Sequence, residues 1–148
     1  MARKEFIRLM EENIVALDRM ATGLQMDPDK VSNVPHQQLR VLVRLYGMPA
    51  RLKDIARREH MSTPNLCAIF RKLERDGLVA RTIDESDRRN TWYRCTPDGD
   101  KIAVAALNNF RSAIEKLFSG ISPADEQKLT GALKALQEVL KDMEKNND

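Results

Sequence analysis

A helical pattern that stops at a glycine and passes directly into two short strand patterns constrains this chain more than any other feature. Residues 63–76 carry apolar side chains at three- and four-residue steps, which places them on one face of a helix. These positions are Leu66, Ile69, Phe70 and Leu73. Gly77 follows, as is typical at the end of a helix. Residues 78–83 and 91–96 then read as strands joined by a polar, hairpin-like link.

Two shorter helical patterns lie directly upstream, over residues 35–47 and 49–60. The first begins at a proline, which is a favourable first helical residue, and ends at Gly47. The second is joined by a short turn to the next helix, which we expect Thr63 to cap, with Pro64 in its first turn. Two helices joined by a short turn and followed by a hairpin predict a winged helix-turn-helix.

Long amphipathic patterns flank this region on both sides. Residues 4–26 form one such pattern before a break at residues 26–30, and Thr96-Pro97 and Ser122-Pro123 each pair a capping residue with a proline to open a helix. The apolar stripes comprise Phe6, Met10, Ile14, Leu17, Met20, Ala21 and Leu24 in the first helix, Ile102, Ala106, Phe110, Ala113 and Leu117 in the second, and Leu129, Leu133, Leu136, Leu140 and Met143 in the third. The predicted fold is mainly α with a small β-hairpin, in the order α-α-α-α-β-β-α-α.

The stripes of the first and the last of these helices are too long to leave exposed, because soluble monomers rarely expose apolar patches of several hundred Å². We therefore expect an obligate dimer. The length of 148 residues suits a single domain, residues 1–148. Within it we expect residues 35–96 to form the winged helix-turn-helix, and residues 1–34 and 97–148 to form a helical dimerisation region.

Composition excludes several classes of protein. The longest uninterrupted apolar run, Ile102 to Leu107, is six residues, whereas a membrane span needs about 20. We therefore expect no membrane partner. Only six glycines and six prolines argue against a disordered or collagen-like chain. Two cysteines cannot form a disulfide framework, so we expect a reducing, cytoplasmic location.

The positive charge is concentrated in the middle of the chain. Residues 51–95 carry eleven Lys and Arg against seven Asp and Glu, an excess of four. The excess is one in residues 1–50, and residues 96–148 carry two more acids than bases. This distribution favours a polyanionic partner for the middle third, although a solvated basic face without a partner remains the alternative.

The outer face of the helix over residues 63–76 is suited to DNA. Pro64, Ala68, Arg71 and Arg75 point away from its apolar face, and Asn65 and Lys72 lie at one edge. Arginine can form paired hydrogen bonds with guanine, and small apolar groups can meet thymine methyls in a major groove. Ser62 and Thr63, with the free N–H groups of the first turn, suit a phosphate. A solvated surface helix is the bland alternative.

The link between the two strands adds a second basic element. Arg88 and Arg89 lie at or near its tip, and such a ribbon can enter a narrow minor groove, where the potential is most negative. We expect Asp87 to be structural, either orienting a neighbouring arginine or closing the turn; a solvated turn acid is the alternative. A basic helix beside a basic hairpin predicts binding of double-stranded DNA.

Three segments together resemble the MarR (multiple antibiotic resistance regulator) family of transcription factors. They are Leu73-Glu-Arg-Asp-Gly77-Leu-Val-Ala-Arg81, Asp87-Arg88-Arg89 and Thr96-Pro-Asp-Gly99. They match the end of the family's recognition helix, its wing signature and the start of its fifth helix, and the resemblance covers nearly the whole chain. It implies a homodimer on a pseudo-palindromic operator, acting as a repressor that a small aromatic or anionic effector releases.

The chain departs from the family pattern at three places. Where Arg71 stands the family often has an acid paired with the wing arginine, so Arg71 should be free to reach DNA. The family often has Thr-Arg at Cys67-Ala68, which predicts an unusual base preference. Cys95 replaces the usual leucine of the second strand, which predicts a small buried hydrophobe.

Cys67 carries an alternative hypothesis for the signal. It lies near the end of the first turn of the recognition helix, where the positive end of the helix dipole and nearby basic residues can lower the pKa of a thiol. Its oxidation would place a polar group beside the phosphates and weaken DNA binding. The bland alternative is that Cys67 fills a small gap.

Other function classes lack support. No catalytic motif occurs, and the two histidines, His36 and His60, stand without clustered ligands, so we expect neither an enzyme nor a metal or cofactor site. A winged-helix module for protein assembly, without DNA binding, is the rival from another class. It predicts an acidic or apolar outer face, which Arg71, Lys72 and Arg75 contradict. The sequence does not identify the residues of an effector pocket.

Overall fold

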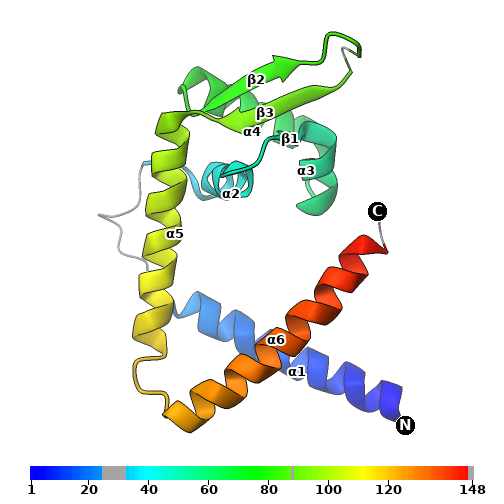
Figure 1. Ribbon diagram of the computed structural model, residues 1–148, viewed down its shortest axis with the longest axis vertical. Helices are drawn as coiled ribbons and strands as arrows, with labels where there is room; N and C mark the ends of the chain where they lie inside the picture. Colours follow the sequence, from blue (N-terminus) through cyan, green and yellow to red (C-terminus); the bar gives the residue numbers. More distant parts are fainter. Residues whose placement is uncertain (25–32, 88, 147–148) are drawn as a thin grey trace. The chain divides into compact units, whose positions relative to one another are not determined.

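The computed structural model describes residues 1–24, 33–87 and 89–146 (Figure 1). The elements run α1 Ala2–Thr22, α2 His36–Leu45, β1 Ala50–Arg51, α3 Leu52–Arg58, α4 Thr63–Arg75, β2 Val79–Ile83, β3 Thr91–Cys95, α5 Pro97–Leu117 and α6 Pro123–Lys145. The chain divides into two compact units, Met1–Ala113 and Ile114–Asp148. The mainly α fold with a winged helix-turn-helix is therefore confirmed. None of the described helices is long and apolar enough to cross a membrane.

The core of the first unit lies where α2, α3 and α4 meet a three-stranded antiparallel sheet of order β1-β3-β2. It comprises Val41, Leu42, Leu45, Ile55, Leu66, Ile69, Phe70, Leu73, Leu78, Val79, Tyr93 and Ala103. The rings of Phe70 and Tyr93 stack with centroids 4.0 Å apart, which joins α4 to β3. Aromatic pairs of this kind contribute about 0.5–1.5 kcal/mol beyond burial. The core thus fixes α4 against the sheet that carries the wing.

The segment predicted as one helix, residues 49–60, begins as a strand. Ala50 pairs with Tyr93 and Arg51 pairs with Trp92, and α3 starts only at Leu52. The predicted hairpin is present as the antiparallel pair β2 and β3, and the structure adds β1 as a third strand where a helix was predicted. The two residues of β1 pair with backbone groups of β3 that lie about forty residues later in the sequence. The periodicity of residues 49–60 contains no information on such a distant partner, so it could not predict this strand.

Both ends of α4 are set by single residues. The Asn65 backbone N–H donates a hydrogen bond to Ser62 Oγ over 3.4 Å, so Ser62 is the cap and Thr63 the first helical residue. The expectation that Thr63 caps the helix was wrong by one position. At the other end Gly77 has a φ of +72°, a conformation that glycine adopts without strain. The chain can therefore turn directly from α4 into β2.

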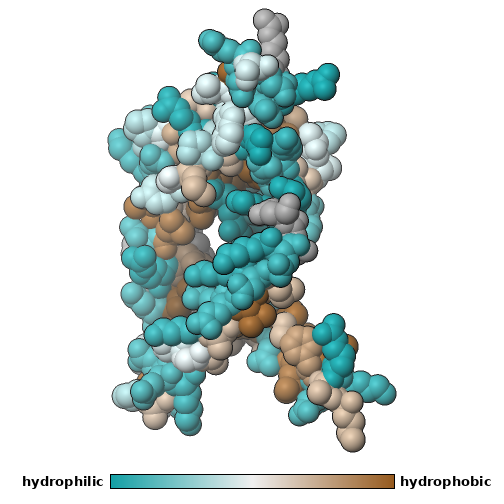
Figure 2. Space-filling model, turned by 45° about the vertical axis from the view of Figure 1, so that its right-hand side comes forward, coloured by the Kyte–Doolittle hydropathy of each residue, from teal (hydrophilic) through white to brown (hydrophobic). Residues whose placement is uncertain are grey.

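The three long helices leave their apolar stripes largely exposed. α1 and α6 bury none of their residues, and α5 buries chiefly small ones. Seven large apolar side chains of α1 are 37% to 58% exposed, Met20 is partly buried, and the large apolar side chains of α6 are 39% to 58% exposed. Figure 2 shows such brown, hydrophobic surface along the helices drawn in its lower part. The predicted break at residues 26–30 lies outside the described residues.

Candidate nucleic-acid interface

The outer face of α4 is exposed as the helical periodicity predicts. Its four apolar positions are buried in the core, so the opposite face points to solvent. The exposed candidate residues are Ser62, Thr63, Pro64, Asn65, Ala68, Arg71, Lys72 and Arg75. The N-terminal half of this face is small and polar or apolar, and its C-terminal half is cationic. A helix with this surface can lie in a major groove of B-form DNA.

The cations of α4 differ in how they are held. Lys72 Nζ lies 3.2 Å from a carboxylate oxygen of Asp76, the residue that follows the last residue of α4. Among the described residues, Arg71 and Arg75 have no carboxylate partner, so both guanidinium groups are free to bind an external acceptor. The helix is tied to the wing elsewhere, because Glu74 lies 3.7 Å from Arg81 of β2.

The wing turn is closed by its own carboxylates. Asp84 Oδ1 accepts hydrogen bonds from the Ser86 hydroxyl and backbone N–H, at 2.6 and 2.9 Å, and these bonds lower the pKa of Asp84. Asp87 Oδ1 accepts a hydrogen bond from the Arg89 backbone N–H at 3.0 Å. Asp87 thus holds the backbone that presents the exposed side chain of Arg89. Arg88 lies outside the described residues.

The two aromatic residues of β3 divide between the faces of the sheet. Tyr93 is buried, and this burial raises its pKa. Trp92 points to the other face and is 38% exposed. The guanidinium of Arg51 lies 5.3 Å from the centre of its ring, and Arg51 Nε is 2.9 Å from Asp54. The sequence had left open which aromatic residue faces the core, and it did not suggest the contact with Arg51.

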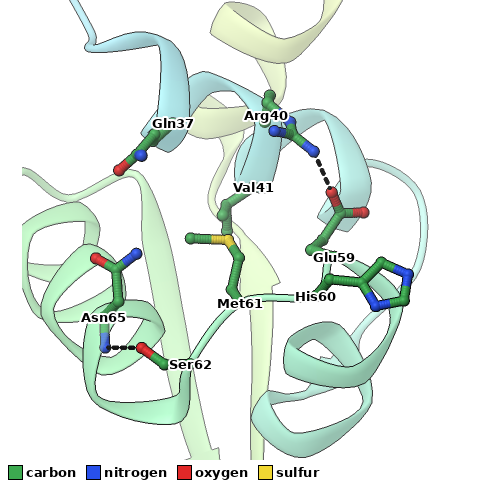
Figure 3. Close-up of a pocket in the computed structure, with 8 residues that line it drawn as sticks. All are labelled: Gln37, Arg40, Val41, Glu59, His60, Met61, Ser62 and Asn65. Atoms are coloured by element: carbon green, nitrogen blue, oxygen red, sulfur yellow. Dashed lines mark hydrogen bonds and ion pairs between the residues drawn. The ribbon is translucent and has the colours of Figure 1, made fainter.

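A small pocket lies beside the N-terminal turn of α4, and sequence reasoning missed it (Figure 3). Its lining residues are Gln37, Arg40, Val41, Glu59, His60, Met61, Ser62 and Asn65. Glu59 connects α2 to the turn before α4, because its oxygens lie 2.8 Å from Arg40 Nη2 and 2.7 Å from Arg44 Nε. One signal for this contact was present in the sequence. Arg40 and Arg44 are four residues apart on a helix, and two such arginines repel each other unless an acid lies between them.

The cysteines occupy two different environments. Cys95 is partly buried against the core, its thiol donates a hydrogen bond to the Leu42 carbonyl at 3.5 Å, and burial raises its pKa to about 11. The residue expected to be a small buried hydrophobe is therefore a partly buried thiol that stays protonated at neutral pH. Cys67 is also partly exposed, on the flank of α4. Within the part of the chain that the structure describes, no group of three potential ligands could hold a metal ion.

A helix-turn-helix with an exposed basic helix and a short wing defines a winged-helix DNA-binding protein. The particular family follows from comparison with known proteins. Residues 34–91 match the model of the MarR family, and the curated relatives that match the chain include transcriptional regulators and a repressor. The predicted resemblance to this family is confirmed over these residues.

One curated relative and two solved structures are similar to this chain over most of its length. The homoprotocatechuate degradative operon repressor of Escherichia coli is 29% identical over 105 residues, which are 70% of this chain and 71% of that protein. FabT of Streptococcus pneumoniae, solved in complex with DNA, superimposes with a TM-score of 0.63 at 18% identity, covering 95% and 96% of the two chains. BpsR of Bordetella bronchiseptica, whose DNA binding 6-hydroxynicotinic acid regulates, gives 0.61 at 22% identity, covering 88% and 98%. The chain spans 64% to 71% of the length of the first curated relatives that it matches.

Proposed function

We propose that this protein is a homodimeric repressor that binds a pseudo-palindromic operator and is released by a small aromatic or anionic effector. The observation that carries the proposal is the outer face of α4, where Arg71 and Arg75 are exposed and have no carboxylate partner among the described residues. α4 then reads bases in the major groove, and Ser62 and Thr63 contact a phosphate. The wing, with Arg88 and Arg89, follows the adjacent minor groove.

The exposed apolar stripes support the dimer. Phe6, Ile14 and Leu17 of α1, and Leu133 and Leu140 of α6, are each about half exposed to solvent. Burying such side chains against a second copy stabilises the assembly by roughly 25 cal/mol per Å². Residues 1–34 and 97–148 are the proposed dimerisation region, and residues 35–96 the DNA-binding region. Analytical ultracentrifugation at micromolar concentration tests this, and a monomeric wild type rejects it.

Similar proteins support the proposal that this protein represses transcription and is released by an effector. The E. coli relative is a repressor of a homoprotocatechuate degradative operon, and BpsR responds to a hydroxylated aromatic acid. We propose the same logic here, with the protein acting in the cytoplasm and an effector that favours a dimer whose recognition helices no longer fit the operator. A thermal-shift screen with aromatic carboxylates, followed by operator binding with each ligand that stabilises the protein, tests this step.

The DNA contacts are tested by substitution. Sequencing of DNA selected from a random pool should give a two-fold symmetric site with half-sites about 10 bp apart. Arg71→Ala and Arg75→Ala should each weaken specific binding by roughly 1–3 kcal/mol if the lost contact pairs with a base. Arg89→Ala should weaken binding evenly across sequences and flatten the salt dependence. Wild-type affinity in all three variants rejects the docking, and a wild type that binds no DNA favours a protein-assembly module instead.

A further inference from the structure

The pocket beside α4 has the polar lining of an anion site. It has a volume of about 190 Å³ and lies between the first turns of α2 and the N-terminal turn of α4, entirely within the first compact unit. In Figure 3 the amide groups of Gln37 and Asn65 extend toward the same space, and the Met61 side chain lies between them and Arg40. Arg40 lies on the same helix as Gln37, three residues further on.

The charges around the pocket leave a net positive excess. Glu59 is the acid of the lining, and only 6% of its side chain is exposed. Both of its oxygens are already engaged, by Arg40 and by Arg44, so two guanidinium groups face one carboxylate. Arg40 gives Glu59 a bond from Nη2 alone, and a guanidinium has five N–H donors in a planar fork. Its remaining donors stay available, since 55% of its side chain is exposed.

Two further donor groups lack partners. The Asn65 backbone N–H is bound by Ser62 Oγ, whereas the side-chain amides of Asn65 and Gln37 have no hydrogen-bond partner among the described residues. Both side chains are exposed, so water satisfies them in the free protein. A guanidinium and two primary amides thus line one open pocket, and phosphate oxygens accept hydrogen bonds from groups of both kinds.

The position of the pocket relative to α4 indicates which phosphate it meets. Asn65 lies on the edge of α4 opposite to Glu74, and Glu74 faces the wing through its contact with Arg81. A helix lying in a major groove about 12 Å wide has a phosphate backbone on each side. The wing lies beside one edge of the helix, so the pocket lies beside the other.

We propose that this pocket holds one backbone phosphate of the bound DNA, with Arg40 and Gln37 of α2 completing the contact that Ser62 and Asn65 begin. The inference rests on the proposed function and extends its DNA interface to α2. Glu59 is then a positioning residue, because it holds the Arg40 guanidinium at the edge of the pocket and does not itself contact the phosphate. A free inorganic phosphate offers the same chemistry and is the other source of such a ligand.

The test compares two arginines that share one partner. Arg40 and Arg44 are both exposed and both pair with Glu59, and of these two only Arg40 lines the pocket. Binding of an arbitrary duplex of about 30 bp is measured for wild type, Arg40→Gln and Arg44→Gln over a series of KCl concentrations. Arg40→Gln should lower affinity about two- to tenfold and reduce the slope of log K against log[salt] by about 0.9 for each protomer bound. Arg44→Gln should leave the slope near that of wild type.

Each outcome separates the hypotheses. Equal slopes for the two variants reject the pocket contact while leaving DNA binding by α4 intact, and a wild type that binds no duplex rejects the proposed function as well. If Arg40→Gln does not fold, the exposed Gln37→Glu takes its place and should repel the same phosphate. Inorganic phosphate at matched ionic strength forms the second arm. Suppose that phosphate stabilises wild type but not Arg40→Gln against heat, and that the salt slopes of DNA binding are equal for Arg40→Gln and Arg44→Gln. The pocket then binds a free anion, and its contact with DNA is rejected.

Discussion

Gly99 is the position where a single added methyl group should do most damage. It lies in the first turn of α5, and a Cβ there would stand 2.0 Å from the carbonyl oxygen of Leu78 and 3.0 Å from its carbonyl carbon. Both are backbone atoms that the fold holds in place. The Leu78 oxygen accepts the Thr96 N–H at 3.0 Å, and the Leu78 N–H donates to the Leu73 carbonyl at 2.9 Å. An alanine therefore requires a backbone shift of roughly 1 Å.

Two opposing effects determine the change in stability of Gly99→Ala. Alanine is favoured over glycine within a helix by about 1 kcal/mol. Overpacking a closely packed site costs about 1–3 kcal/mol, and the upper end applies where the obstructing atom is hydrogen-bonded backbone. We expect a net destabilisation of roughly 2 kcal/mol. The substitution also moves the start of α5 away from the turn between α4 and β2, so it should weaken DNA binding.

Gly131→Ala is the matched control. Gly131 lies within α6, about 200° around the helix from Leu129, so it is opposite to the apolar stripe, and a Cβ there would have nothing within 4 Å. Without a clash, the propensity gain of up to about 1 kcal/mol should appear as added stability. Urea unfolding at one fixed protein concentration measures both variants. A Gly99→Ala protein as stable as wild type, or more stable, refutes the reasoning.

Three further substitutions or labelling experiments test the site. Glu59→Gln removes the carboxylate that Arg40 and Arg44 share, so the free energy of unfolding in urea should fall by about 1–2 kcal/mol; an unchanged value contradicts the role given to this ion-pair cluster. With a pKa of about 11, Cys95 is about 1% thiolate at pH 9, whereas a thiol with a pKa of 9.0 is about half thiolate. In a Cys67→Ser background, iodoacetamide should therefore label Cys95 roughly fiftyfold more slowly in the folded protein than in the unfolded chain. Equal labelling rates refute the raised pKa. Asp87→Ala should change stability by less than about 0.5 kcal/mol yet weaken DNA binding, measured by fluorescence anisotropy, because the turn that presents the wing loses its bond to the backbone.

Periodicity predicted those parts of the fold that depend on local burial. The helix over residues 63–76 and its buried face were both predicted correctly. Because a helix has 3.6 residues per turn, the apolar residues of this segment can share only one face, and that face turns inward. The caps at Thr96 and Ser122 were also identified, because a capping bond spans only three residues. Ser62 and Thr63 are adjacent hydroxyl residues, and local sequence cannot choose between them.

Features set by distant pairing could not be predicted in this way. β1 has two residues and exists because Ala50 and Arg51 find partners on β3. The choice between Trp92 and Tyr93 as the buried aromatic residue depends on which face of the sheet α4 covers, and alternation along one strand is the same in both cases. The pocket beside α4 depends on Glu59 folding back onto α2, a contact between side chains 15 and 19 residues apart.

The apolar stripes of α1 and α6 show what periodicity leaves undecided. The pattern identifies an apolar face, but a face that packs inside the chain and a face that packs against a second copy give the same spacing. Exposure separates the two cases. The α4 stripe is at most 7% exposed, whereas Leu133 and Leu140 of α6 are 49% and 47% exposed in the isolated chain. Apolar surface of this extent is unfavourable in water, so the exposed fractions support the homodimer that we proposed from the length of these stripes in the sequence.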